Sequence, residues 1–269
     1  MMAGGKQEVR VIDRRSFIAG ALAGASGVGV LGGGVSVLRR PPKTAAEPQP
    51  AEPKKPEPQF QGCVSYSQMG EDIVLFHLLR FGMKIDKPTY LDIGAADPIE
   101  GSNTYLLHWN GGHGVLVEPN PAFQARLRVH RPNDVVVNAG VGVSDAQEAD
   151  YYIIRNAPPL NTFSPDDVAI LRARAHEDVV ERVIKMPLIS INRLIAEHLG
   201  ASPDLLSIDV EGMDFAILRT LDFKKYRPAV VIAETLPRGP IPKLLASKGY
   251  EIRGASMYNT IFADPKRYA

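Results

Sequence analysis

The sequence predicts an α/β protein with a doubly wound, mostly parallel, Rossmann-like sheet that includes an antiparallel end strand. Short apolar runs, typical of buried strands, alternate with segments of helical pattern. Five of these runs end in an acid or an amide, at Asp92, Glu118, Asn138, Asp209 and Glu234. Because parallel strands place their carboxyl ends at one edge of a sheet, this row of polar ends predicts a ligand site there.

Length and charge limit the other possibilities. The 269 residues suit one sizeable α/β domain with an appendage better than two full domains. Residues 1–59 carry nine Lys and Arg against five Asp and Glu, and the remainder carries 22 against 25. This slightly acidic remainder argues against nucleic acid as a partner. A single cysteine, Cys63, excludes an internal disulfide and a Cys-based zinc site.

Residues 1–40 are expected to be a twin-arginine-like signal or a membrane anchor outside the folded domain. The pair Arg14-Arg15 precedes an uncharged run over 16–38, which as a helix is long enough to cross a bilayer. Two more arginines directly after the run favour a retained anchor, and the nearly balanced charges on its two sides do not decide its orientation. We expect the folded domain to lie in the cytoplasm. Export by the twin-arginine route and a disordered Gly-rich arm are the alternatives. Seven prolines within 41–59 predict a semi-extended linker.

The folded domain is expected over residues 60–269, and its first β-α unit is centred on the run Tyr90–Ile93. A hydroxyl followed by acids at 67–72 predicts a helix before this strand. Gly94 ends the strand in a tight turn, where a residue without a Cβ lets a ligand approach the main chain. Residues 102–104 offer caps for the helix that follows. Strand, turn and helix are typical of the first half of a nucleotide-binding unit.

The second strand, over 114–118, ends in Glu118 at about the spacing of a carboxylate that binds ribose hydroxyls. The elements expected next are a helix around 121–130, a buried run over 135–142, strands over 149–155 and 183–189, and between them a helix from Pro165 through about Val180. We expect residues 148–189 to form an insertion that roofs the site.

The parallel sheet resumes after the insertion, because strand and helix patterns alternate again. The expected elements are a helix from Ser190 through His198, a strand over 205–212, a helix over 215–221, a strand over 229–234, a helix over 241–248, and strands over 250–255 and 259–263. A short turn joins the last two strands, which predicts that they are antiparallel to each other.

Six motifs, in order along residues 65–236, resemble the FkbM-type S-adenosylmethionine-dependent methyltransferases. They are Ser67-Gln68-x-Gly70-Glu71-Asp72, Leu91-Asp92-Ile93-Gly94-Ala95, Ser102-Asn103-Thr104-Tyr105, Gly114-x-x-Val117-Glu118-Pro119-Asn120-Pro121, Asn138 to Asp145, and Ile208-Asp209-Val210-Glu211-Gly212-x-Asp214. The sequence departs from the family at Ala96-Asp97-Pro98, where many members have Asn and then a later Gly, and the proline stiffens this loop. The resemblance implies the sheet of a class I methyltransferase and does not cover residues 1–59.

The resemblance also implies methyl transfer from S-adenosylmethionine, the expected cofactor, to an oxygen of a sugar or small metabolite. The positions expected to bind the cofactor are Gln68, Asp92, Gly94, Ala95, Asp97, Asn103, Glu118, Asn120, Asn138 and Asp209. Among them, the turn that starts at Asp92 would hold the methionine part, Glu118 would bind the ribose hydroxyls, and Asn138 would lie near the adenine.

Asp209 and Glu211 are the candidate catalytic residues, because a carboxylate within hydrogen-bond reach can take the proton of an attacking hydroxyl. Support of the cofactor or of the loop, without proton transfer, is the alternative role. No metal is predicted; a divalent ion between Asp209 and Glu234 is the alternative. We expect a small-molecule or glycan acceptor, a membrane contact through the N-terminal segment and no protein partner.

Two other functions compete with methyl transfer. A membrane-tethered, non-catalytic module of methyltransferase fold would account for the departure at Ala96-Asp97-Pro98 and for the N-terminal segment. A nicotinamide-dependent oxidoreductase is disfavoured, because the sequence has no Gly-x-Gly-x-x-Gly at the first strand.

Overall fold

The computed structural model describes residues 64–210, 212–235 and 239–268, so the predicted N-terminal signal or anchor and the linker lie outside the described residues. Within the described residues, no helix has both the length and the apolar character needed to cross a membrane. The elements are, in chain order, α2 (Glu71–His77), η1 (Leu78–Gly82), β1 (Thr89–Ile93), α3 (Tyr105–Trp109), β2 (His113–Val117), α4 (Pro121–His130), β3 (Val135–Val137), β4 (Gly140–Val141), β5 (Glu148–Ile154), η2 (Pro158–Leu160), α5 (Pro165–Ala175), β6 (Val180–Ile189), α6 (Ile191–Leu194), η3 (Ile195–Leu199), β7 (Leu205–Ile208), α7 (Asp214–Thr220), β8 (Val230–Glu234), α8 (Pro240–Ser247), β9 (Glu251–Ala255), β10 (Asn259–Ala263) and η4 (Pro265–Arg267).

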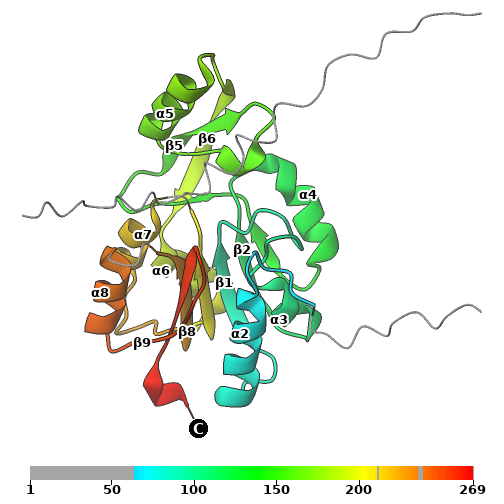
Figure 1. Ribbon diagram of the computed structural model, residues 1–269, viewed down its shortest axis with the longest axis vertical. Helices are drawn as coiled ribbons and strands as arrows, with labels where there is room; N and C mark the ends of the chain where they lie inside the picture. Colours follow the sequence, from blue (N-terminus) through cyan, green and yellow to red (C-terminus); the bar gives the residue numbers. More distant parts are fainter. Residues whose placement is uncertain (1–63, 211, 236–238, 269) are drawn as a thin grey trace, which may run out of the picture. The chain divides into compact units, whose positions relative to one another are not determined.

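The main sheet has seven strands in the order β3-β2-β1-β7-β8-β10-β9 (Figure 1). The first five strands in this order are parallel, and β10 is antiparallel to both of its neighbours. The predicted doubly wound, mostly parallel sheet is confirmed, and its antiparallel strand lies one position inside the edge. Because the chain passes from β3 on one side of β1 to β7 on the other, the topological switch point lies between β1 and β7.

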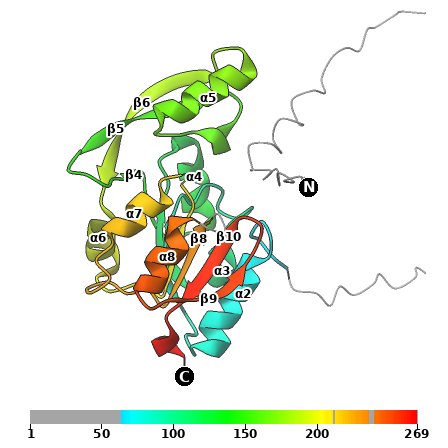
Figure 2. The ribbon, with the colours of Figure 1, turned by 60° about the vertical axis from the view of Figure 1, so that its left-hand side comes forward.

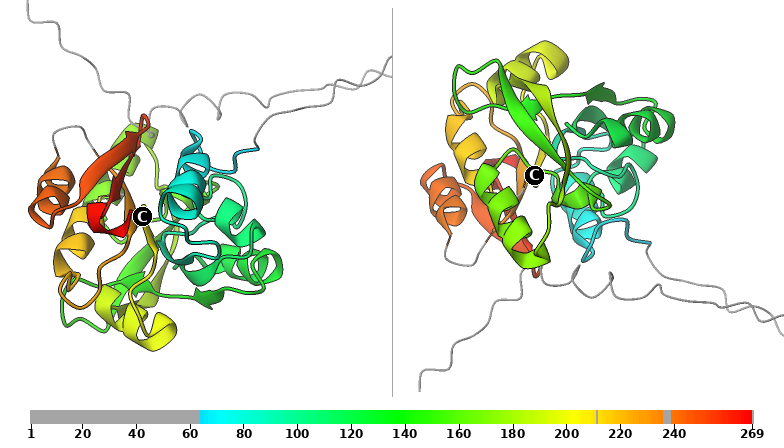
Figure 3. Two further views of the ribbon diagram at one scale, coloured as in Figure 1. Left: turned by 90° about the horizontal axis from the view of Figure 1, so that it is seen from below. Right: turned by 90° about the horizontal axis from the view of Figure 1, so that it is seen from above.

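Helices cover both faces of this sheet (Figure 3), and one apolar core lies between each face and its helices. One core contains buried residues of α6, α7 and α8, and the other contains buried residues of α2, α3 and α4. Strand side chains alternate between the two cores, as the pleat requires. In β1, Leu91 and Ile93 pack into the first core and Tyr90 into the second.

The segment after β3 forms a second sheet of three strands in the order β4-β6-β5, with α5 beside it (Figure 2). β5 and β6 are antiparallel to each other, and β4 is parallel to the end of β6. The single run expected over 135–142 is wrong, because it breaks at Asn138. The amide Nδ2 of Asn138 donates to the backbone oxygens of Glu118 and Pro119, at 3.0 and 2.9 Å, and the chain then leaves the main sheet.

Two helix boundaries also differ from the prediction. The helix expected through Val180 ends at Ala175, because His176 adopts left-handed backbone angles with φ 56°. The start of α2 lies later than expected, because Gly70, with φ 85°, is its N-cap. The Oγ of Ser67 still caps the first turn, since it accepts a hydrogen bond from the N–H of Asp72 at 3.2 Å, and it donates to the carboxylate of Asp72 at 2.9 Å.

Candidate functional site

The carboxyl ends of β1 and β7 approach closely at the switch point, and Gly94 permits this approach. Gly94 has φ +84°, and a Cβ there would lie 2.0 Å from the backbone oxygen of Asp209. The N–H groups of Gly94 and Ala95 donate to the backbone oxygen of Val117, at 2.9 and 3.2 Å, which ties the turn to β2 as well. The structure therefore brings together Gly94, Ala95 and Asp209, three of the residues predicted for the site.

Glu118 lies beside the same turn, immediately after β2, and is buried. Its Oε2 accepts a hydrogen bond from the N–H of Ala96 at 2.9 Å, and its Oε1 accepts one from the N–H of Asn120 at 2.6 Å. Burial raises the pKa of Glu118 to about 7; the two hydrogen bonds oppose this shift, and the nearby charge of Asp92 adds to it. Glu118 therefore changes its charge near neutral pH.

Asp92 lies within β1 and points away from solvent. Its Oδ2 accepts a hydrogen bond from the Oγ1 of Thr104 at 2.6 Å, so it links the strand to the start of α3. Burial raises the pKa of Asp92, while the hydrogen bond from Thr104 and the charge of Arg131 lower it. Asn103, next to Thr104, donates through Nδ2 to the Oγ of Ser207 in β7 at 3.4 Å. Asp92 and Asn103 therefore both connect the loop before α3 to strands at the switch point.

Asp97 shapes the loop between β1 and α3. Its Oδ1 accepts hydrogen bonds from the N–H groups of Ile99 and Glu100, both at 3.0 Å, and its Oδ2 pairs with Nη1 of Arg126 at 2.6 Å. The side chain of Gln68, which is exposed, lies beside this loop, 3.7 Å from the position that a Cβ on Gly101 would take. Both predicted residues thus lie at the loop, and Asp97 uses its oxygens within the protein.

The two sides of the Asp97 ion pair should contribute unequally to stability. Because half of the Arg126 side chain is exposed, we expect Arg126→Gln to change the free energy of unfolding by less than about 1 kcal/mol. Asp97→Ala also removes two hydrogen bonds to backbone N–H groups, so we expect it to cost about 1–3 kcal/mol. Urea unfolding of both variants measures the difference, and equal losses would contradict it.

Asn120 offers a hydrogen-bond donor that the protein does not use. It is the N-cap of α4, where its Oδ1 accepts a hydrogen bond from the N–H of Ala122 at 3.0 Å. The side chain is buried, and its Nδ2 has no hydrogen-bond partner. Because buried amides are nearly always paired, this donor lies where a ligand atom would satisfy it, two residues from Glu118.

Asp209 lies at the end of β7, close to Asp214 at the start of α7. Burial, and after it the charge of Asp209, raise the pKa of Asp214 to about 7. The N–H of Val210 donates to Oδ1 of Asp214 at 3.3 Å, so Asp214 also holds the turn after β7. Glu211, the second predicted catalytic residue, lies outside the described residues. In the part of the chain that the structure describes, no three His, Cys, Asp or Glu residues are placed to hold a metal ion.

The raised pKa values of Glu118 and Asp214 predict that the protein loses stability as the pH rises. Both groups bind a proton more tightly in the folded state, with pKa about 7, than in the unfolded state, where the pKa is near 4. Their contribution is therefore full below pH 4 and is lost as the pH rises to 7. We expect the free energy of unfolding to fall by roughly 5 kcal/mol between pH 5 and 8, about 2.5 kcal/mol for each group. Urea unfolding at a series of pH values measures this, and a rise across the same range would contradict it.

Glu71 has a structural role that its neighbourhood in the sequence does not predict. It is buried, and its Oε1 accepts hydrogen bonds from the Oγ of Ser256 at 2.6 Å and from Nδ2 of Asn259 at 3.1 Å. Its Oε2 accepts a hydrogen bond from the N–H of Met69 at 2.8 Å. These contacts attach the segment before α2, which contains Gln68, to the hairpin of β9 and β10. From the sequence, Ser256 and Asn259 are expected only to be turn residues, and nothing there predicts their hydrogen bonds to Glu71.

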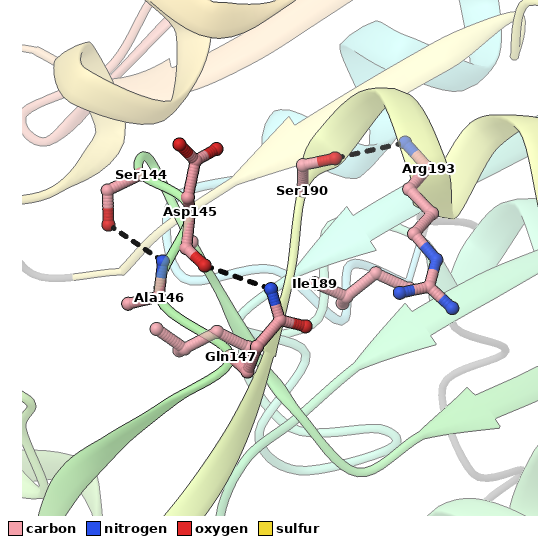
Figure 4. A pocket seen from close by; sticks show the side chains of 9 residues that line it. Ser144, Asp145, Ala146, Gln147, Ile189, Ser190 and Arg193 are labelled. Atoms are coloured by element: carbon pink, nitrogen blue, oxygen red, sulfur yellow. Dashed lines mark hydrogen bonds between the residues drawn. The ribbon is translucent and has the colours of Figure 1, made fainter.

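A pocket of about 170 Å³ lies near this edge of the sheet, between the loop over 142–147 and the start of α6 (Figure 4). Ser144 and Asp145 lie on one side of it, and Ser190 and Arg193 lie on the other. The pocket adjoins the segment from Asn138 to Asp145 that resembles the methyltransferase motif. Because Asp92, Glu118 and Asp209 do not line it, the pocket is separate from the switch point.

A doubly wound, mostly parallel sheet defines a Rossmann-like domain, and such sheets commonly bind ligands at the carboxyl edge beside the switch point. The family model described as Methyltransferase FkbM domain matches residues 92–252, more than half of the chain. The chain therefore belongs to the FkbM methyltransferase domain family.

Two solved structures are similar to this chain. The first is a TehB-like SAM-dependent methyltransferase from Corynebacterium glutamicum, with 12% identity and a TM-score of 0.38 over 73% of this chain and 88% of that one. The second is a precorrin-6y C5,15-methyltransferase from Geobacter metallireducens, with 17% identity and a TM-score of 0.35 over 68% and 72%. No curated protein matches the sequence significantly.

Proposed function

We propose that the protein transfers a methyl group from S-adenosylmethionine to a hydroxyl oxygen of a sugar or small metabolite. Membership of the FkbM methyltransferase domain family supports methyl transfer. Binding of S-adenosylmethionine is supported by two groups that lie close together: the Glu118 carboxylate beside the Gly94 turn and the unpartnered Nδ2 of Asn120. A carboxylate that accepts and an amide that donates match the hydroxyl groups of a ribose, which both donate and accept hydrogen bonds.

Each of these groups would have its own part in holding the cofactor. Glu118 would accept hydrogen bonds from the ribose hydroxyls, and Asn120 would donate through Nδ2 to an oxygen or nitrogen of the nucleoside. The backbone of Gly94 and Ala95 would face the methionine part. Asn138 holds the backbone oxygens of Glu118 and Pro119 through its Nδ2, so it would support the ribose-binding carboxylate from behind. S-adenosylmethionine supplies an activated methyl group on a sulfonium, which leaves positioning as the main task of the protein.

Asp209 would act as the general base. As the acceptor oxygen forms its bond to the methyl carbon, the bond between sulfur and that carbon breaks, and the hydroxyl proton passes to the Asp209 carboxylate. Asp214, whose pKa is raised to about 7 by burial and by the charge of Asp209, would be about half protonated at neutral pH, which reduces the negative charge beside Asp209.

Titration calorimetry of the full chain with S-adenosylhomocysteine tests the cofactor, and mass spectrometry of a panel of sugars and small hydroxyl compounds tests the transfer. We expect binding and a product 14 Da heavier, the mass of a CH₂ that methylation adds. Absence of binding would reject the proposal. Binding without any methylated product would favour the non-catalytic module, and binding of a nicotinamide cofactor instead would favour an oxidoreductase.

We also propose that the run over 16–38 anchors the protein in a membrane, with the methyltransferase domain in the cytoplasm. The uncharged run, followed directly by Arg39 and Arg40, supports the anchor. The charges on its two sides are nearly balanced and do not set the orientation. A cytoplasmic domain would have direct access to S-adenosylmethionine. Protease treatment of sealed vesicles that carry the full chain tests the side: cleavage within 41–59 from the periplasmic face would contradict a cytoplasmic domain.

A further inference from the structure

Arg131, which ends α4, is a buried cation in which every N–H group has an acceptor. Its side chain is 1% exposed, and its Nε donates to Oδ2 of Asp134 at 2.8 Å. Nη2 donates to the hydroxyl of Tyr90 at 3.0 Å. Asp134 is itself fully buried and accepts further hydrogen bonds from the Tyr90 hydroxyl and from the N–H of Gly114. The charge of Arg131 is therefore balanced inside the protein by one carboxylate.

The other three N–H groups of Arg131 all point to one loop. Nη1 donates to the backbone oxygen of Pro98 at 3.2 Å and to the Oγ of Ser102 at 3.4 Å, and Nη2 donates to the Oγ1 of Thr104 at 2.9 Å. These acceptors lie in the loop between β1 and α3 and at its end, where Thr104 is the N-cap of α3. A guanidinium has five N–H donors, so two serve the ion pair and its tyrosine while three hold the loop.

Thr104 connects this network to the candidate cofactor site. Its hydroxyl accepts a hydrogen bond from Arg131 and donates one to Oδ2 of Asp92 at 2.6 Å. The Thr104 hydroxyl has one hydrogen, and Arg131 can only donate. Thr104 therefore accepts from Arg131 and uses its own hydrogen for the bond to Asp92. The charge of Arg131 also lowers the pKa of Asp92 against the effect of burial.

We propose that Arg131 is a positioning residue for cofactor binding, which acts through Thr104 on Asp92 and through Pro98 and Ser102 on the loop after β1. This inference rests on the proposed function. In this protein a buried guanidinium fixes the loop between β1 and α3. Lysine cannot replace it, because an ammonium group lacks the planar arrangement of five donors.

The test compares binding of S-adenosylhomocysteine with stability in variants of the full chain. Thr104→Val removes the bridging hydroxyl at nearly constant volume, and Thr104→Ser retains it. We expect Thr104→Val to raise the Kd about tenfold, and Thr104→Ser to stay within about threefold of the wild type. Arg131→Lys should raise the Kd at least as much as Thr104→Val.

Arg227→Lys is the matched control, because Arg227 also forms an ion pair, with Asp264 at 2.6 Å, and donates to the backbone oxygen of Lys248 at 2.8 Å. We expect it to shift the urea midpoint and leave the Kd unchanged. If Arg131→Lys does not fold, the two Thr104 variants decide the question. Wild-type affinity in Thr104→Val would overturn the positioning role alone, whereas a wild type that binds no S-adenosylhomocysteine would overturn both this role and the proposed function.

Discussion

Asp209→Asn is expected to lower kcat for methyl transfer by about 10²–10⁴-fold, the usual contribution of a general base. Asparagine has nearly the same size and still forms hydrogen bonds, but it cannot take a proton. The backbone of Asp209, whose N–H donates to the oxygen of Ile93 at 3.0 Å, is unaffected by the change. The Kd for S-adenosylhomocysteine should therefore change by less than about threefold. Single-turnover rates and calorimetry on the same preparation measure the two quantities.

Asp204→Asn is the matched control for this prediction, because Asp204 immediately precedes the same strand, at the opposite edge of the sheet. Its Oδ2 accepts hydrogen bonds from the N–H and the Oγ1 of Thr89, at 2.9 and 3.0 Å. We expect Asp204→Asn to cost about 1–3 kcal/mol of stability and to leave kcat unchanged. If Asp209→Asn keeps its kcat, Asp209 supports the loop and the proton leaves by another route.

That the acidic residues of the candidate site share one edge of the sheet could be predicted, because each has a local signal. Asp92, Glu118 and Asp209 lie at or immediately after the ends of short apolar runs, and the parallel order of those runs places them at one edge. Gly94 is predictable for the same reason, since a strand that ends at a ligand needs a residue without a Cβ. The structure adds a second reason for a glycine at position 94, which is its close approach to the backbone of Asp209. The sequence does not show this reason, because the two residues come together only through the pairing of β1 with β7.

The supporting residues have no such local signal. Glu71 looks like an ordinary acid in the first turn of a helix, yet its partner Ser256 is 185 positions away. Arg131 follows the short helix α4 at a place where an exposed arginine is the common case, and only the positions of Asp134 and Thr104 explain its burial. Buried polar networks depend on contacts between elements, so they become visible when the sheet order is known and not before.

Glu118→Gln is expected to weaken binding of S-adenosylhomocysteine about 10²-fold at pH 8, because it replaces a charged acceptor of two ribose hydroxyls. Glutamine also presents an NH₂ group where the carboxylate accepts hydrogen bonds from the N–H groups of Ala96 and Asn120, at 2.9 and 2.6 Å. In the wild type, the pKa of about 7 makes the fraction of charged Glu118 fall as the pH falls. Wild-type affinity should therefore weaken by about tenfold from pH 8 to pH 6, and the variant should lose this dependence. Calorimetry at pH 6, 7 and 8 measures both effects.

Asp264→Asn is the matched control for Glu118→Gln. It shows what the loss of a buried carboxylate does when that carboxylate lies away from the candidate site. Asp264 is 3% exposed and pairs with Nε of Arg227 at 2.6 Å, just after β10. Its change should lower stability and leave both the Kd and its pH dependence as in the wild type, because Asp264 does not lie at the switch point. If Glu118→Gln binds as tightly as the wild type at pH 8, the ribose lies elsewhere and the raised pKa of Glu118 reflects burial alone. If instead the wild type binds equally well at pH 6 and pH 8 while Glu118→Gln still loses affinity, Glu118 acts on the ligand through its hydrogen bonds to the turn and not through its charge.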